Sequence, residues 1–349
     1  TCDDRRIAMG LTPTKRAGRI MSRGEAIALG WTALFAWPLI ARAQQPTKIA
    51  RLGYLGFGAP SDRASASRVE ALRAGLRELG YIEGKNLAIE FRWPDTVEAL
   101  HEAAAELVRM KVDVILVNSS TESEAARRAT STIPIVFATH ADPVGVGHVA
   151  SLAQPGGNMT GLADQAAVTT AKRIEILKET VPRATRFGVL YTPTTPAHRA
   201  ILQAAEAARG KLSIQLLTVG VKTVGEFDGA FSKMARDRVE AVFVQGAQFM
   251  AGANAKPLAE LALKHRLPTM FGNRANVVAG GLMSYAADYT DQHRRAAVYI
   301  DKILRGAKPG DLPVEQYSRY QMVINLKTAR ALGLTIPPSV LARADEVIE

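Results

Sequence analysis

Arg51-Leu52-Gly53-Tyr54-Leu55-Gly56-Phe57 is an apolar run that ends in a glycine-rich turn. Its length and composition predict a short strand buried on both faces, as the strands of parallel sheets are. Residues 67–79 follow, with apolar side chains at the spacing of an amphipathic helix, and Gly80 provides a natural stop. A buried strand followed by such a helix begins a βαβ unit, so this segment predicts an α/β fold.

The same alternation of strands and helices continues along the chain. It starts afresh after Gly156-Gly157, and we expect the break between two lobes within residues 158–164. Two successive series predict two doubly wound lobes, each with a parallel sheet and right-handed crossovers. The predicted strands are 51–57, 87–91, 112–117, 133–138, 187–191, 213–219, 241–245, 268–271, 281–285 and 321–326, and the predicted helices are 67–79, 98–110, 121–129, 170–180, 196–209, 224–236, 257–264, 291–304 and 328–332.

The last third of the chain fits two topologies. It either extends the second lobe, or crosses back to the first lobe near Met283-Ser284 and returns near Asp311. In the second case three segments bridge the lobes. The apolar pattern alone favours neither.

The N-terminal region has the composition of an export signal. Ser22-Arg23-Gly24 precedes an apolar run of 14 residues, 27–40, and Ala41-Arg42-Ala43 follows as a cleavage signal. A bilayer span needs about 20 residues, so the run predicts a cleaved signal peptide over 21–43 rather than a permanent anchor. We expect translation to start at Met21, because residues 1–20 begin with Thr1 and lack apolar periodicity. Those 20 residues are expected to be an over-extended, disordered start.

Composition restricts the function classes. The single cysteine, Cys2, precedes the apolar run, so cleavage after Ala43 leaves a chain without disulfides or cysteine–metal sites. The net charge is +11, and the first 43 residues carry seven basic and three acidic side chains, which leaves +7 for the rest. Basic pairs such as Arg127-Arg128 lie on predicted helices among acidic residues, as on solvated helix faces. We therefore expect no nucleic-acid partner.

Several segments, in their order and spacing, resemble one family. The chain is similar to the bacterial ABC-transporter substrate-binding proteins of the tryptophan/tyrosine-binding type, from the leader to Glu349. The segments that carry this resemblance are Trp37-Pro38-Leu39-Ile40-Ala41-Arg42-Ala43-Gln44-Gln45, Gly75-Leu76-Arg77-Glu78-Leu79-Gly80-Tyr81, Thr130-Ser131-Thr132-Ile133-Pro134-Ile135-Val136-Phe137, Asp142-Pro143-Val144-Gly145, Ser151-Leu152-Ala153-Gln154-Pro155-Gly156-Gly157-Asn158-Met159-Thr160-Gly161, Arg294-Arg295-Ala296-Ala297-Val298-Tyr299, Ile324-Asn325-Leu326-Lys327-Thr328-Ala329 and Arg343-Ala344-Asp345-Glu346.

The resemblance implies the type I periplasmic-binding-protein fold. In that fold two lobes are joined by three crossovers and close on a small molecule, which favours the bridging topology. The implied N-terminal lobe is 48–157 plus about 285–308, and the implied C-terminal lobe is about 163–281 plus 312–349. The resemblance also implies a periplasmic location and delivery of the ligand to a membrane permease with a separate ATPase. We expect a monomer.

Candidate ligand-binding residues lie in the turns after the strands. Ligands of open α/β sheets bind beyond the carboxyl ends of the strands, where helix starts present free N–H groups. The first lobe offers Tyr54, Phe57, Ser119, Ser120, Thr121, His140 and Asp142, and the second offers Tyr191, Thr194, Thr195, Gln245, Asn273 and Asp288.

Each candidate also has a structural interpretation. Hydroxyls of residues 119–121 fit a ligand carboxylate and equally fit a helix cap. Asp142 suits a ligand ammonium or a turn before Pro143. Tyr54, Phe57 and Tyr191 suit an aromatic ligand or the core. Asn273 suits a polar ligand group or a turn.

The remaining motifs do not predict catalysis. The glycines after the first strand lack the G-x-G-x-x-G spacing of nucleotide binding, and there is no G-x-S-x-G or Walker motif. His140, Asp142 and His148 lack a helical pair, so we expect no metal site. We also expect no cofactor and no catalytic residues.

The sequence thus predicts a periplasmic solute-binding component of an ABC importer rather than an enzyme. By resemblance, the ligand is a small aromatic or apolar amino acid or related carboxylate, captured by hinge closure. The alternatives are a binding protein that presents its solute to a sensor and an exported enzyme on the same fold. Neighbouring permease and ATPase genes would favour the importer, and ligand turnover would favour the enzyme.

Overall fold

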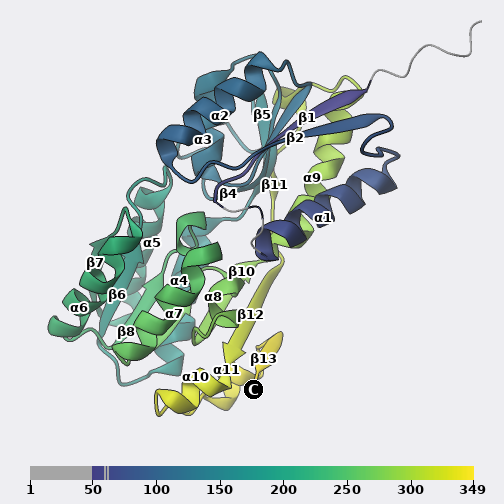
Figure 1. Cartoon of the computed structure of the whole chain (residues 1–349). Coiled ribbons are helices and arrows are strands. Elements are labelled where there is room, and N and C mark those ends of the chain that lie inside the picture. The colour runs from purple at the N-terminus through teal and green to yellow at the C-terminus, as the bar shows by residue number, and fades with distance from the viewer. Residues whose placement is uncertain (1–48, 59, 61–62) are drawn as a thin grey trace, which may run out of the picture. The chain divides into compact units, whose positions relative to one another are not determined.

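Two sheets of mostly parallel strands form the fold (Figure 1). The computed structural model describes residues 49–58, 60 and 63–349. The expected leader and the segment before it lie outside these residues. Among the described helices, none is long and apolar enough to cross a membrane.

The first sheet has six parallel strands in the order β11-β5-β4-β3-β1-β2. Apolar strands such as β3, Val-Ile-Leu-Val, are wholly buried because helices cover both faces. The elements of this first lobe are β1 (Ala50–Leu55), α1 (Arg63–Glu78), β2 (Leu87–Arg92), α2 (Val97–Arg109), β3 (Val114–Val117), α3 (Ser120–Ala129), β4 (Ile135–His140), β5 (Met159–Ala163), α9 (Tyr289–Leu304) and β11 (Glu315–Gln316).

The second sheet has seven strands in the order β13-β12-β10-β9-β8-β6-β7. Its one antiparallel pair is β10 with β12, because the chain leaves this lobe along β10 and returns along β12. The elements of the second lobe are α4 (Ala166–Thr180), β6 (Arg186–Tyr191), α5 (His198–Leu212), β7 (Gln215–Gly220), α6 (Phe227–Arg236), β8 (Ala241–Val244), α7 (Ala255–Lys264), β9 (Thr269–Phe271), α8 (Arg274–Val278), β10 (Met283–Ala287), β12 (Tyr320–Asn325), α10 (Leu326–Ala331), α11 (Pro338–Leu341) and β13 (Glu346–Ile348).

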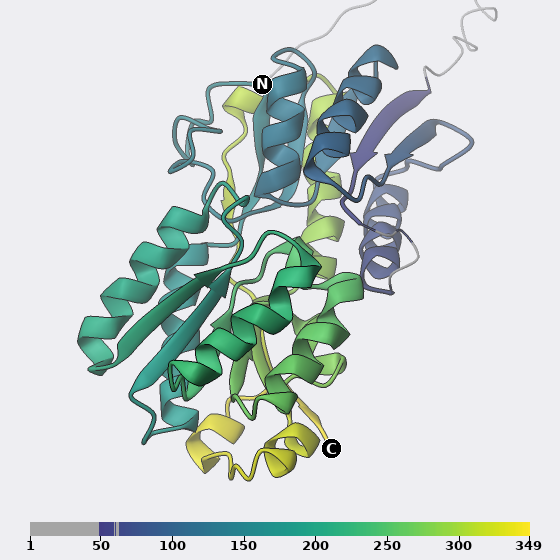
Figure 2. The same cartoon turned by 60° about the vertical axis from the view of Figure 1, so that its left-hand side comes forward.

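The chain passes between the sheets three times: after β5, after β10 and after β11. Helix α9 therefore packs on α1 and β4 of the first lobe, although the strand before it, β10, belongs to the second. Figures 1 and 2 show this yellow-green helix among the purple and blue elements. The bridging topology is the correct one of the two that the sequence allowed.

The lobe boundaries differ from those that the sequence analysis gave. Strand β5 (Met159–Ala163) extends the first sheet beyond residue 157, and β10 keeps pairing with β12 through Ala287, beyond the expected boundary at 285. Strand β11 (Glu315–Gln316) pairs with β5, so the return to the second lobe follows Gln316 rather than residue 312. The first crossing, after Ala163, falls within the expected range 158–164, whereas the second and third come later than expected because strand pairing continues through Ala287 and Gln316.

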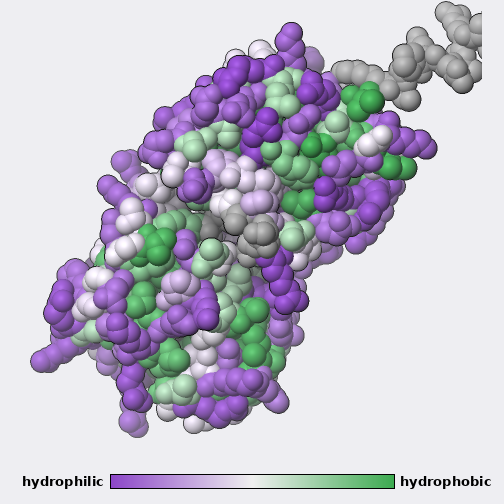
Figure 3. All heavy atoms as spheres, viewed as in Figure 1, coloured by the Kyte–Doolittle hydropathy of each residue, from purple (hydrophilic) through white to green (hydrophobic). Residues whose placement is uncertain are grey.

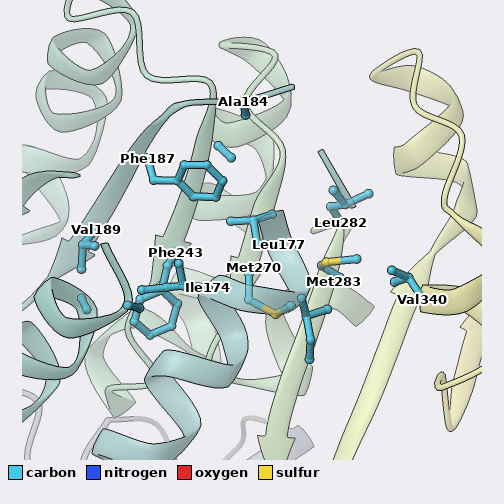
Figure 4. Close-up of a cluster of buried hydrophobic side chains, with 14 of the residues drawn as sticks. Ile174, Leu177, Ala184, Phe187, Val189, Phe243, Met270, Leu282, Met283 and Val340 are labelled. Atoms are coloured by element: carbon cyan, nitrogen blue, oxygen red, sulfur yellow. The ribbon is translucent and has the colours of Figure 1, made fainter. Parts of the chain in front are cut away.

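The core has an apolar cluster on each face of each sheet. Figure 4 shows one of them, where Ile174 and Leu177 of α4 pack over Phe187, Phe243 and Met270 of the second sheet. Burying a side chain of this size contributes about 1.5–3 kcal/mol. This packing holds the ends of strands β6, β8 and β9 in register where they meet the other lobe.

Candidate functional site

A cavity of about 70 Å³ lies where the carboxyl ends of the two sheets face each other. Residues from both lobes and from the segment that joins β5 to α4 line it. They are Arg68, Asn118, Ser119, Ser120, Thr121, Thr139, His140, Ala141, Tyr289 and His293 from the first lobe, and Asp164, Ala166, Thr170, Arg173, Thr195, Ile201, Phe243, Gln245, Gly246, Ala247 and Asn273 from the joining segment and the second lobe. This is the position at which open α/β sheets bind ligands.

Two buried guanidinium groups face the cavity from opposite lobes. Arg68 of α1 is 6% exposed and lies 5.3 Å over the Tyr289 ring. Arg173 of α4 is 5% exposed, and its Nε donates to the Tyr285 carbonyl at 2.6 Å. Burial lowers the pKa of Arg173, yet arginine keeps its charge in proteins. Asp164 interacts electrostatically with Arg173, and the buried Glu122 does so with Arg68. A ligand carboxylate can add a charge-assisted hydrogen bond to either guanidinium.

The acid in the cavity is Asp164, which follows β5 at the first crossing between the lobes. Its Oδ1 is buried and has no hydrogen-bond partner among the described residues. Burial raises the pKa of Asp164 to about 6, and the Arg173 guanidinium only partly opposes this. The hydroxyl oxygens of Thr139 and Thr170, which also line the cavity, likewise lack a partner in the described part of the chain. These oxygens are available to a polar ligand.

The start of α3 adds polar groups from the first lobe. Ser119 caps the helix, because its Oγ accepts from the Thr121 N–H at 3.1 Å, and it donates to Glu122. Ser120 Oγ lies 3.3 Å from His140 Nδ1 and accepts from the Ala141 N–H at 3.1 Å. A helix start presents N–H groups and a partial positive charge, which together favour an anion.

Burial disfavours the charged form of the two histidines of the cavity. Burial lowers the pKa of His140 well below its usual value, and His148 beside it lowers it further. Burial likewise lowers the pKa of His293 to about 3, with the Arg68 charge as a further cause. His293 Nδ1 donates to the Tyr289 carbonyl at 2.6 Å, which holds the ring against the cavity.

The second lobe contributes the ends of β6, β8 and β9. Gln245 Oε1 accepts from the Thr192 N–H at 2.8 Å, and Asn273 Oδ1 caps α8 through the Ala275 N–H at 3.0 Å. Gly246 and Gly272 allow the strand ends to approach: a Cβ on Gly246 would lie 2.5 Å from the Gly272 carbonyl oxygen. These two glycines bring Gln245 and Asn273 to the same side of the cavity.

The structure brings seven of the thirteen sequence candidates together at this cavity, and their ligand-binding role stays a prediction. They are Ser119, Ser120, Thr121, His140, Thr195, Gln245 and Asn273. Several of them also have structural roles, since Ser119 and Asn273 cap helices.

Three aromatic candidates lie elsewhere. Tyr54 is wholly buried in the first-lobe core, with its ring centroid 5.1 Å from that of Trp93. Phe57 packs half-buried against that lobe's other apolar cluster. Tyr191 stacks on His198 at 6.1 Å. Strand side chains point to alternate faces of a sheet, into the helix layers, so an aromatic residue at a strand end reaches the core rather than the cavity.

The other three candidates also lie outside the cavity lining. Asp142 Oδ1 accepts from the Gly145 N–H at 2.8 Å, as a turn aspartate does. Thr194 is exposed, with its Oγ1 3.0 Å from that of Thr192. Asp288 caps α9 through the N–H groups of Thr290 and Asp291 and lines a separate hollow.

Sequence reasoning missed the charged residues of the cavity, Arg68, Arg173 and Asp164. The signal was available for the two arginines. Arg68 lies four residues before Leu72 and Arg173 four before Leu177, so each shares the apolar face of its helix. A charged side chain on an apolar face is informative because burying it is costly. Asp164 had no such signal, since it follows a strand that was not predicted.

Residues 61–348 match the family of ABC transporter substrate binding proteins. The chain belongs to this family. A curated relative, the tyrosine-binding protein of Clostridioides difficile strain R20291, is 26% identical over 274 residues, which cover 78% of this chain and 77% of the relative. These relatives are binding proteins rather than enzymes.

Solved structures of substrate-binding proteins show the same type I periplasmic-binding-protein fold. The structure of a Streptococcus pneumoniae ABC domain in complex with L-Trp superposes with a TM-score of 0.79 at 27% identity, over 86% of this chain and 99% of that one. A conserved domain protein from Vibrio cholerae superposes with a TM-score of 0.80 at 28% sequence identity, over 86% of this chain and 100% of that one. Within the described part of this substrate-binding protein, no group of three or more His, Cys, Asp or Glu side chains is placed to hold a metal ion.

Proposed function

We propose that this protein is the solute-binding component of an ABC importer and that it captures an aromatic or apolar amino acid, or a related carboxylate. The observation that carries the proposal is the pair of buried guanidiniums, Arg68 and Arg173, which face one cavity together with Asp164, whose Oδ1 has no hydrogen-bond partner among the described residues. A zwitterion complements this arrangement, because its carboxylate suits the guanidiniums and its ammonium suits Asp164.

The apolar part of the lining suits the ligand's side chain. Phe243, Ile201 and Tyr289 line the cavity beside the polar groups, and aromatic rings of this kind favour stacked or edge-on contacts with an aromatic ligand. The tyrosine-binding relative and the L-Trp complex support an aromatic amino acid as the first ligand to test.

Hinge closure is the proposed mechanism of capture. The cavity is lined from both lobes, and three crossing segments join the lobes. Ligand sites commonly measure about 300–1,000 Å³, so a cavity of about 70 Å³ favours entry through separation of the lobes. Ligand binding then shifts an equilibrium between open and closed arrangements.

Delivery and location complete the proposal. The protein is exported through the leader at 21–43, acts in the periplasm as a monomer, and presents its closed form to a membrane permease and its ATPase. The surface supports a free domain: on the face in Figure 3, hydrophilic residues cover the outer edges of both lobes and hydrophobic ones form separate patches. N-terminal sequencing of the exported protein should begin at Gln44, and light scattering should give the mass of one chain.

A binding screen tests the proposal. The purified full chain is titrated calorimetrically with the twenty amino acids and with indole-3-propionate, which lacks the amino group of tryptophan. We expect micromolar or tighter binding of L-tryptophan or L-tyrosine and a rise in melting temperature at saturating ligand. Binding of none of these compounds would overturn the proposed ligand class, and turnover of a bound compound would favour the enzyme alternative.

A further inference from the structure

A chain of four buried or half-buried side chains leads from the cavity to the surface. Ser120 Oγ lies 3.3 Å from His140 Nδ1, His140 Nε2 lies 2.8 Å from His148 Nδ1, and His148 Nε2 lies 2.9 Å from Glu124 Oε2. Only Ser120 and His140 line the cavity. We call the set Glu124–His148–His140–Ser120 the histidine relay.

Backbone geometry determines where the protons of the relay lie. The Asp142 N–H donates to His140 Nδ1 at 3.1 Å, so this nitrogen is an acceptor and carries no hydrogen. A neutral His140 then carries its hydrogen on Nε2 and donates to His148 Nδ1. His148 in turn carries its hydrogen on Nε2 and donates to Glu124. In this arrangement the single lone pair of His140 Nδ1 is shared between the Asp142 N–H at 3.1 Å and the Ser120 hydroxyl at 3.3 Å.

Glu124 is a lasting acceptor at the outer end. Although its partial burial acts in the opposite direction, hydrogen bonds from Arg127, Arg128 and His148 lower the pKa of Glu124 to about 2. The carboxylate therefore stays ionised across the ordinary pH range. Charged groups lie at both ends of the relay. At the outer end, Glu124 pairs with Arg127 and Arg128. At the cavity end, the charged residues of the lining are Arg68, Arg173 and Asp164.

The relay has a consequence for the Ser120 hydroxyl. A hydroxyl has one hydrogen and two lone pairs. Ser120 uses one lone pair for the Ala141 N–H at 3.1 Å, and its hydrogen is directed to the acceptor nitrogen of His140. What remains for the cavity is a single acceptor site. With the opposite tautomer of His140, the same hydroxyl would be free to donate to the ligand.

We propose that Glu124 and His148 are positioning residues that act together with the Asp142 N–H to hold His140 in its Nε2–H tautomer, and so keep Ser120 as an acceptor for the ligand's ammonium group. This inference rests on the proposed function as an amino-acid-binding protein. Ser120 would then share the ammonium with Asp164. The Asp164 backbone lies beside that of His140, because the Asp164 N–H donates to the His140 carbonyl at 2.9 Å. The first lobe would thereby distinguish an amino acid from a carboxylate of the same shape.

A spectroscopic experiment on the ligand-free full chain tests the tautomer. Nitrogen-15 NMR of histidine-labelled protein at pH 7.5 distinguishes protonated from unprotonated ring nitrogens. We expect an unprotonated Nδ1 and a protonated Nε2 for both His140 and His148, with assignments from His140→Gln and His148→Gln. A protonated Nδ1 on His140 would overturn the proposal, and this result needs no ligand.

A binding experiment tests the positioning role. We expect Glu124→Met to weaken L-tryptophan binding about tenfold, the size of one hydrogen bond, and to change indole-3-propionate binding less than about twofold. Glu124→Gln should retain most of the affinity, because its amide oxygen still accepts from His148. Glu102→Met, which removes an exposed ion pair with Arg109 on α2, is the matched control.

The outcomes separate the inference from the proposed function. An equal loss for both ligands, or no loss for either, would overturn the positioning role while leaving amino-acid binding intact. Failure of the unchanged protein to bind any amino acid would overturn the proposed function and, with it, the role of Ser120 toward an ammonium. If Glu124→Met lowers the melting temperature strongly, the L-tryptophan affinities of Glu124→Gln and Glu124→Asp are compared instead. The shorter Asp side chain cannot reach His148 in the same geometry, so the positioning role predicts weaker binding by Glu124→Asp, and equal affinities would overturn it.

Discussion

The two lobes share one fold plan, yet they face the cavity with different chemistry. The first lobe presents most of the titratable groups, namely Arg68, His140, Tyr289 and His293. The second lobe presents mainly neutral or apolar side chains, with one cation: Thr195, Ile201, Phe243, Gln245, Asn273 and Arg173. Asp164 lies between them at the first crossing. Under the proposed function, the first lobe and the crossing would recognise most of the ligand's charges, with Arg173 as the second lobe's cation, and the second lobe would contact its apolar part.

The largest expected effect concerns Asp164, the acid between the lobes. Its folded pKa of about 6 exceeds the ordinary value of 3.8, so the folded state binds a proton more tightly than the unfolded state. The ligand-free protein should therefore lose on the order of 3 kcal/mol of stability as the pH rises from about 4 through 6. Urea unfolding at several pH values measures this loss.

The variant Asp164→Asn tests how the carboxylate of the same residue affects both stability and ligand binding. The variant should lack this component of the pH dependence and be more stable than the unchanged protein at pH 7.5. It should also bind L-tryptophan about tenfold more weakly, because a neutral amide replaces the carboxylate beside the ammonium. A variant that is less stable at pH 7.5 and binds normally would show that Asp164 is satisfied without a ligand.

Substitution of the two cavity arginines compares the contributions of the two lobes to ligand affinity. We expect Arg68→Met to weaken amino-acid binding about a hundredfold and Arg173→Met about tenfold. Arg68 is expected to contribute more because it lies in the first lobe, whose α3 start also favours an anion at the cavity. Calorimetric titration measures both, with Arg77→Met, which removes an exposed ion pair on α1, as the control. A larger loss for Arg173→Met would move the carboxylate site to the second lobe.

The two helix caps at the cavity, Ser119 in the first lobe and Asn273 in the second, are expected to contribute differently to the free energy of unfolding. Ser119→Ala should cost about 2 kcal/mol, because it removes the cap of α3 and leaves the wholly buried carboxyl of Glu122 without its serine donor. Asn273→Ala should cost about 1 kcal/mol, since it removes only the cap of α8. Urea unfolding of both variants gives the difference, and equal costs would contradict the role of Glu122.

The smallest effects are expected at two sequence candidates outside the cavity lining. Asp142→Asn keeps an acceptor for the Gly145 N–H, and Thr194→Ala removes an exposed hydroxyl. Both should change amino-acid affinity by less than about twofold. A loss above tenfold in Asp142→Asn would restore the sequence-based role of Asp142 as the ammonium partner.

Strong apolar patterns made most of the fold predictable. The run 112–117 contains strand β3, and the amphipathic segments 98–110 and 291–304 correspond closely to α2 and α9. Strand β5 was missed because Met159–Ala163 contains Gly161, which has φ +146° and where a Cβ would clash with the Phe137 carbonyl oxygen. A short strand with a glycine at its centre lacks the β-branched pattern that predicts strands.

The sequence by itself determined the fold class, the alternation of its elements and the strand-end turns in which seven candidate residues lie. These depend on local periodicity, which each segment carries in its own residues. Only the tertiary structure decided that Arg68, Arg173 and Asp164 meet in one cavity, and that His148 and Glu124 reach it through His140. Such groupings join residues from different strands, helices and loops, and they follow from how the sheets and helices pack rather than from any local pattern.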